Sequence, residues 1–142
     1  MTTLPESLLE VREHNAPDYK PLIDYGAWRV ALMNYTSDLT PDKINRMQKH
    51  TETDEVFVLL VGRCILFLGE GGEAVTRVHA VDMELNKLYN VKRGVWHSHT
   101  FSEDAKVLIV ENRDTVEANS PFVGLSKEQC EEVVRETTRL WG

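Results

Sequence analysis

The chain has 142 residues, and its 23 acidic side chains outnumber its 16 basic ones, which gives a formal net charge of −7. This length fits one domain with a single core, and 42% hydrophobic with 27% charged residues is ordinary for a globular protein. No basic run is longer than Lys92 and Arg93, which argues against nucleic acid and anionic membrane surfaces as partners, because binding to phosphates needs clustered Lys and Arg.

The first 40 residues read as an N-terminal arm that ends in one strand. Pro17 and Pro21 indicate a loop, because proline lacks a backbone donor. Residues 28–35 are mostly apolar and are bounded by turn residues, so we expect a strand there. Thr40 suits a helix N-cap and Pro41 suits a first helical turn, so a short helix or a turn begins at this point.

Residues 44–112 carry a strong β signal. Short apolar or alternating runs predict strands at 56–61, 64–68, 75–81, 88–91, 94–99 and 106–111. Gly62 and Arg63 predict a tight turn that joins the first two of these strands into a hairpin. Because many short strands follow one another with little helix between them, we expect an all-β fold, either an antiparallel sandwich or a small barrel.

A helix is predicted over residues 126–141. Ser126 and Gln129 form a capping-box pattern at its start. Val133, Val134 and Leu140 then recur at near-helical spacing. We expect this helix to lie outside the β structure or against a partner.

The sequence carries no targeting or disulfide signal. No apolar run approaches the ~20 residues of a membrane span, and residues 1–6 lack the basic and apolar regions of a secretory leader. Cys64 and Cys130 form no CxxC pair, which favours two reduced thiols. We therefore expect a single cytoplasmic domain over residues 1–142 with no membrane partner.

One stretch combines a histidine, a carboxylate and a glycine at a regular spacing. His50 is followed by four residues and Glu55, and then by six residues and Gly62. This spacing resembles the first motif of the cupin superfamily, in which His-x-His is followed by three or four residues, Glu, six residues and Gly. His50 matches the second histidine of the pair, and Gln48 stands where the first is usual.

A second match lies downstream. The cupin motif Pro-x-Gly, two residues, His is similar to Lys92 through His97, with Gly94 in place and lysine where proline is usual. The Asn that often follows is absent near Phe101. The resemblance covers residues 26–112. It implies a small single-domain cupin, an antiparallel jelly-roll β-barrel (a double-stranded β-helix) with its core in residues 44–112, and a homodimer that exchanges N-terminal strands such as residues 28–35.

The motif residues are expected to converge. Gln48 and His50 are two apart and would share one face of a strand, Glu55 opens the next strand, and His97 comes from a distant one. A closed barrel would bring them around one cavity, where they would form a divalent metal site for Fe, Mn, Ni or Zn. A plainer interpretation stays open, in which His50 is a cavity-lining or core histidine and Glu55 an ordinary strand-edge carboxylate.

Two nearby residues are candidates for acid–base roles. Glu52 is two residues from His50 and would be a reserve ligand or an acid–base group, although a solvated loop acid is the plainer interpretation. His99 is two residues from His97 and either shares its face or points to the barrel mouth.

Trp96 precedes His97 in a Gly-Val-Trp-His segment. This segment is similar to the ureidoglycolate lyase branch of cupin-like proteins, where it lines a site for a small hydroxy acid. The resemblance implies a substrate pocket of Gln48, His50, Glu55, Trp96 and His97, while a core position is the alternative for Trp96. Two functions remain open: a metal-dependent lyase, isomerase or dioxygenase acting on a small organic acid or sugar, or a cupin that binds such a ligand without metal or turnover.

Overall fold

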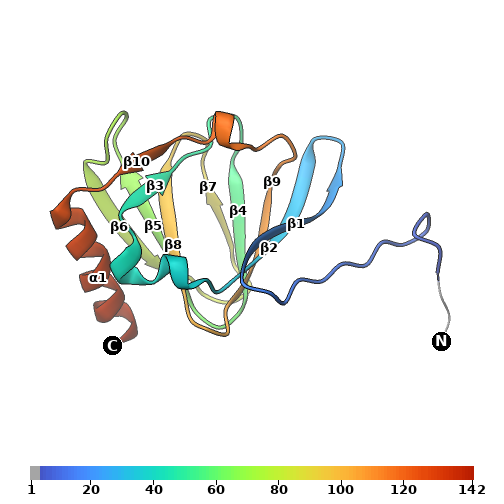
Figure 1. Cartoon of the computed structure of the whole chain (residues 1–142), viewed down its shortest axis with the longest axis horizontal. Helices are drawn as coiled ribbons and strands as arrows, with labels where there is room; N and C mark the ends of the chain where they lie inside the picture. Colours follow the sequence, from blue (N-terminus) through green and yellow to red (C-terminus); the bar gives the residue numbers. More distant parts are fainter. Residues whose placement is uncertain (1–3) are drawn as a thin grey trace.

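The computed structural model describes residues 4–142 and shows two antiparallel sheets facing each other (Figure 1). The first sheet has the order β1 (Asp18–Tyr25), β2 (Trp28–Asn34), β9 (Lys106–Asn112), β4 (Glu55–Val61) and β7 (Leu88–Val91). The second has the order β10 (Phe122–Gly124), β3 (Arg46–Gln48), β8 (Trp96–Phe101), β5 (Cys64–Glu70) and β6 (Arg77–Asp82). The all-β, jelly-roll-like architecture is confirmed, but within residues 4–142 the two sheets do not close into one hydrogen-bonded barrel.

The arm contains a strand that the sequence does not reveal. Residues 18–25, predicted as a loop, form β1 and pair with β2. Pro21 is tolerated within the strand because β1 is an edge strand and its register shifts between Pro21 and Ile23. The predicted strand at 28–35 is confirmed as β2, but it lies between β1 and β9 and not at an edge. Thr40 precedes a single 3-10 turn, Pro41–Lys43, after a similar one at Ser37–Leu39.

The predicted hairpin around Gly62 is wrong. β4 and β5 are consecutive in the chain, yet β4 pairs with β7 and β9, whereas β5 pairs with β6 and β8. Gly62 has φ +77, and an added Cβ would lie 2.8 Å from the backbone of Ala105. This glycine therefore carries the chain from one sheet to the other at a point where no side chain fits. The hairpin that does form joins β5 to β6.

The core has two layers. Between the sheets, Phe57, Leu59, Val107 and Ile109 are each at most 2% exposed. The second layer lies between the outer face of the second sheet and the helix α1 (Lys127–Trp141), whose Val133 is fully buried. Figure 1 shows this helix against the β6 side of the sandwich.

The predicted C-terminal helix and the two predicted reduced cysteines agree with the structure. The capping box is present, because Ser126 accepts from the Gln129 backbone and Gln129 accepts from the Ser126 backbone. Cys64 and Cys130 are both free thiols. Among residues 4–142, no helix has the length and apolar character needed to cross a membrane.

Candidate metal centre

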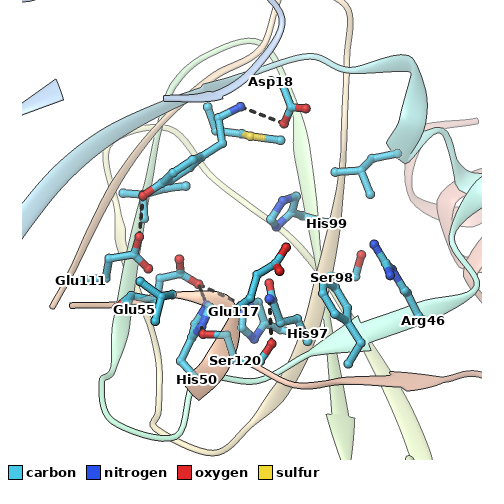
Figure 2. A pocket seen from close by; sticks show the side chains of 18 of the residues that line it. Asp18, Arg46, His50, Glu55, His97, Ser98, His99, Glu111, Glu117 and Ser120 are labelled. Atoms are coloured by element: carbon cyan, nitrogen blue, oxygen red, sulfur yellow. Dashed lines mark hydrogen bonds and ion pairs between the residues drawn. The ribbon is translucent and has the colours of Figure 1, made fainter. Parts of the chain in front are cut away.

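A cavity of about 480 Å³ lies between the two sheets (Figure 2). Its walls come from β1, β2 and β9 on one side and from β3 and β8 on the other, and the segment that leads into β10 also contributes. The cavity lining includes Asp18, Tyr19, Arg29, Arg46, Gln48, His50, Glu55, His97, His99, Glu111, Glu117, Ser120 and Phe122. This volume is within the range of small-molecule sites.

Three buried side chains meet at one point of the cavity wall. The Nε2 atom of His50 lies 3.1 Å from Oε1 of Glu55, and the Nε2 atom of His97 lies 2.9 Å from the same oxygen. His50 lies just after β3, Glu55 is the first residue of β4, and His97 belongs to β8. Both sheets therefore contribute side chains to this group. One ligand atom from each residue lies within 4.8 Å of the others, which makes the group a possible metal site.

The far nitrogen of each imidazole is anchored. Nδ1 of His97 lies 3.0 Å from the Val95 carbonyl, which only accepts, so this nitrogen carries the proton. Nδ1 of His50 lies 2.7 Å from the Ser120 hydroxyl, which itself donates to Oδ1 of Asn119 and therefore accepts from the ring. In the neutral rings both Nε2 lone pairs then face the Glu55 carboxylate.

Such a convergence of lone pairs needs positive charge between the three atoms. In the metal-free protein a proton on an imidazole supplies it. Burial lowers the pKa of His50, but the hydrogen bond and the charge of Glu55 outweigh this and raise the pKa above its usual value. Burial alone would raise the pKa of Glu55, yet the hydrogen bonds to His50 and His97 bring it well below its ordinary range.

A divalent cation suits the same three atoms. Metal bonds to nitrogen and oxygen are about 2.1 Å long, so neighbouring ligand atoms at right angles are separated by about 3 Å. The Nε2-to-oxygen distances of 2.9 and 3.1 Å agree with that separation. Two imidazoles and one carboxylate with further positions open are typical of 2-His-1-carboxylate metal sites.

Gln48 lines the same cavity. Its side-chain amide donates to the Ser120 carbonyl over 3.0 Å. Gln48 and His50 both face this cavity, as expected from their spacing. The Gln48 amide and the His50 ring both hydrogen-bond to Ser120.

Of the three remaining predicted site residues, His99 lines the cavity, whereas Glu52 and Trp96 do not. His99 lines it, with an edge contact to Phe57, and its Nδ1 is buried without a hydrogen-bond partner among residues 4–142. Burial lowers the pKa of His99 to about 4, so the ring is neutral at pH 7. Glu52 is exposed and does not line the cavity.

Trp96 also requires a correction. Strand alternation turns it to the opposite face of β8 from His97, into the layer beneath α1, where it is 3% exposed. Its indole donates to the Gly72 carbonyl over 2.9 Å. Trp96 is therefore a core residue, as in the alternative interpretation, and not part of the pocket wall.

A second polar cluster in the cavity was missed by sequence reasoning. Glu111 accepts at Oε1 from the Tyr19 hydroxyl over 2.6 Å and from the Arg29 guanidinium over 2.7 Å. Burial, together with the negative charge of Glu55, raises the pKa of Glu111. The available signal was the alternation of β9, which places Glu111 in the same inward row as Val107 and Ile109. Nothing in the sequence signalled Tyr19 or Ser120.

Comparison with known proteins supports the fold. No family model matches the chain, and no curated protein matches it. Among solved structures, a cupin-2 domain containing protein from Shewanella frigidimarina NCIMB 400 superposes with a TM-score of 0.50 at 20% identity, over 76% of this chain and 88% of that one. The chain has a cupin fold.

Other structures that resemble this cupin fold include enzymes. Pac13, a nucleoside dehydratase, has a TM-score of 0.55 at 9% identity, over 82% of this chain and 87% of its own. FeII HppE has a TM-score of 0.51 at 17% identity, over 66% of this chain and 48% of its own. At these identities the superpositions show a shared fold alone, and the cavity of this chain lies between the two sheets of that fold.

Proposed function

We propose that this chain is a metal-dependent cupin enzyme that acts on a small organic acid or sugar in the cavity, as a lyase, isomerase or dioxygenase. The observation that carries the proposal is the convergence of two anchored imidazoles on one buried carboxylate, with His50, Glu55 and His97 as the ligands. A divalent Fe, Mn, Ni or Zn ion bound there would supply Lewis acidity toward a carbonyl or hydroxyl oxygen.

The chain's own residues would prepare the site. Val95 and Ser120 hold the imidazole tautomers through Nδ1. His99, neutral at pH 7, presents a ring that can exchange a hydrogen bond with a bound molecule, which makes it a candidate acid–base residue. Phe57 packs against the rings of His97 and His99 and keeps them in place.

A metal-free binding protein is the second candidate. The observation in its favour is Gln48, which stands where a further imidazole ligand is usual and whose amide is bound to the Ser120 carbonyl. In that protein a protonated imidazole in place of a metal would balance Glu55, and the cavity would hold a ligand without turnover.

Metal analysis of protein purified without chelator separates the two candidates. We expect about one equivalent of Fe, Mn, Ni or Zn per chain, and a loss of most of it in His50→Ala, because one of three ligands is removed. His79→Ala is the matched control, since His79 is exposed and pairs with Glu70 outside the cavity. A metal-free wild-type protein whose ligand binding survives His50→Ala would establish the binding protein instead.

We also propose that the chain forms a homodimer through the outer face of the first sheet. The helix α1 covers the second sheet. Residues 14–16 contact Asn34 and Lys106 at one end of the outer face of the first sheet, and no helix within residues 4–142 lies over the rest of that face. Strand register aligns two rows of outward side chains there, Val30–Val110–Val56 and Leu32–Leu108–Val58. This surface, the apolar face, carries no charge, so two chains of net charge −7 can meet on it without opposing carboxylates.

The substitution Leu108→Glu tests the dimer. It places a carboxylate at the middle of the apolar face and is expected to convert the dimer to a monomer, as measured by light scattering after size-exclusion chromatography. Val134→Glu, on the exposed side of α1, should leave the mass unchanged. A wild-type protein that is already monomeric would contradict this proposal.

A further inference from the structure

One arginine at the cavity has no acidic partner among residues 4–142. The Cζ atom of Arg46 lies 3.7 Å from the ring centroid of Phe122, so the guanidinium is stacked on the phenyl ring. Both residues line the cavity, Arg46 from β3 and Phe122 from β10. Stacking occupies one face of the guanidinium and leaves its in-plane N–H groups available to an acceptor.

The other arginine of the cavity differs in this respect. Arg29 is 15% exposed at its side chain and is committed to Glu111, to the Thr115 carbonyl and to the Arg113 carbonyl. Arg46 makes no ion pair and no hydrogen bond through its side chain with any of residues 4–142. It is therefore the cation of the cavity wall that a ligand anion can reach.

Two acidic side chains share the wall with Arg46. Asp18 and Glu117 line the cavity, and neither has an ion-pair partner among residues 4–142. Figure 2 shows Glu117 pointing into the cavity, with its carboxylate below His99 in this view. Carboxylates repel a ligand that is only anionic, but they accept hydrogen bonds from hydroxyl groups, which bring no charge. The cavity wall thus combines a guanidinium that can bind an anion with carboxylates that can accept hydrogen bonds from ligand hydroxyl groups.

Resting on the function proposed above, we propose that the cavity binds a hydroxylated small molecule with a terminal anionic group, as in a sugar acid or a sugar phosphate. The anionic group lies on Arg46, the hydroxyl groups face Asp18 and Glu117, and the rest of the molecule reaches toward His50, Glu55 and His97. Of the two ligand classes proposed above, this inference selects an anionic molecule over a neutral sugar. The guanidinium recognises carboxylate and phosphate through the same planar N–H geometry.

Calorimetric titration of the metal-loaded protein with three related sugars tests the inference. D-Glucuronate, D-glucose 6-phosphate and D-glucose share a ring with hydroxyl groups and differ at the terminal group. We expect at least one of the two anions to bind about tenfold or more tightly than glucose, because a charge-assisted pair with Arg46 is added. The anion that binds more tightly identifies the terminal group as carboxylate or phosphate.

Arg46→Gln should remove that preference and leave glucose binding unchanged. Arg46→Lys keeps the charge but loses the planar stack, so we expect an intermediate affinity. Arg135→Gln is the matched control, because Arg135 lies on α1 away from this cavity. The inference is overturned if neither anion binds the wild-type protein, if glucose binds as tightly, or if Arg46→Gln leaves anion binding unchanged.

The two proposals fail in different ways. If metal is bound through His50 and the Arg46 variants bind as the wild type does, the metal-dependent function stands and the anionic substrate class is wrong. If the protein holds no metal yet prefers the anion through Arg46, the cavity is an acid-binding site and the enzyme proposal is wrong.

Discussion

Glu55→Gln is expected to weaken metal binding by more than about 100-fold, because an amide oxygen replaces the charged ligand that both imidazoles face. In the metal-free protein we expect a loss of about 1–3 kcal/mol in unfolding free energy, since His50 loses a strong acceptor but can release its proton. Metal titration and urea unfolding measure the two effects.

Glu52→Gln is the control for this change. It is the same chemical substitution three residues earlier, on an exposed side chain outside the cavity. We expect wild-type metal affinity and a change in stability within about 0.5 kcal/mol. Equal losses in the two variants would show that Glu55 is not a ligand.

The pH dependence of the wild-type protein follows from the same cluster. The pKa of Glu55 is lowered in the folded state, so its contribution to stability is present above the unfolded value, about 4.3, and is lost as the pH falls toward the folded value. The pKa of His50 is raised, so its contribution is present below about 6.5 and is lost as the pH rises through the folded pKa. Metal displaces the imidazole protons, and its affinity should therefore fall on acidification.

Arg29→Ala is expected to destabilise the protein by about 3–5 kcal/mol in urea unfolding at pH 7. Arg29 pairs with Glu111 over 2.7 Å, and the Glu111 side chain is 3% exposed. Removing the cation leaves a buried carboxylate with only the Tyr19 hydroxyl, and the loss of one partner from a buried pair carries a large cost. The pKa of Glu111, already raised by burial and by Glu55, should rise further.

Arg113→Ala provides the comparison for Arg29. Arg113 lies just beyond the same β9 strand and pairs with Asp24, but both side chains are about half exposed, and its distance to the carboxylate is 3.5 Å. A solvated pair of this kind contributes about 0–1 kcal/mol. If the two arginine variants lost the same free energy, burial would not be the cause of the Arg29 effect.

The sequence predicted most of the strands and the terminal helix because their signals are local. Alternation along β4 and β9, turn residues between strands and the Ser126 capping box each depend on neighbours within a few residues. β1 was missed because Pro17 and Pro21 indicate a loop, and the edge position that tolerates Pro21 is a tertiary property. The Gly62 turn was misread because pairing partners are not encoded at the turn itself.

The site also contains residues that the sequence predicted correctly and one that it placed wrongly. The spacing of His50, Glu55 and His97 was sufficient to predict that these residues would converge, because it matches a known motif and because alternation places each on an inward face. The resemblance placed Trp96 in the pocket, but this residue is adjacent to His97 and strand alternation turns it to the opposite face of β8, under α1.

An acidic composition without basic clusters argues against nucleic acid as a partner, but it does not tell which carboxylates belong to a site. The sequence by itself was sufficient for the fold class and the helix, because these depend on local periodicity, and for the three converging residues, because they match a known motif. Only the tertiary structure decided which carboxylates are inside. Glu55 and Glu111 face the cavity and Glu52 does not, since burial and partners such as Arg29 and Ser120 come from segments far apart in the chain.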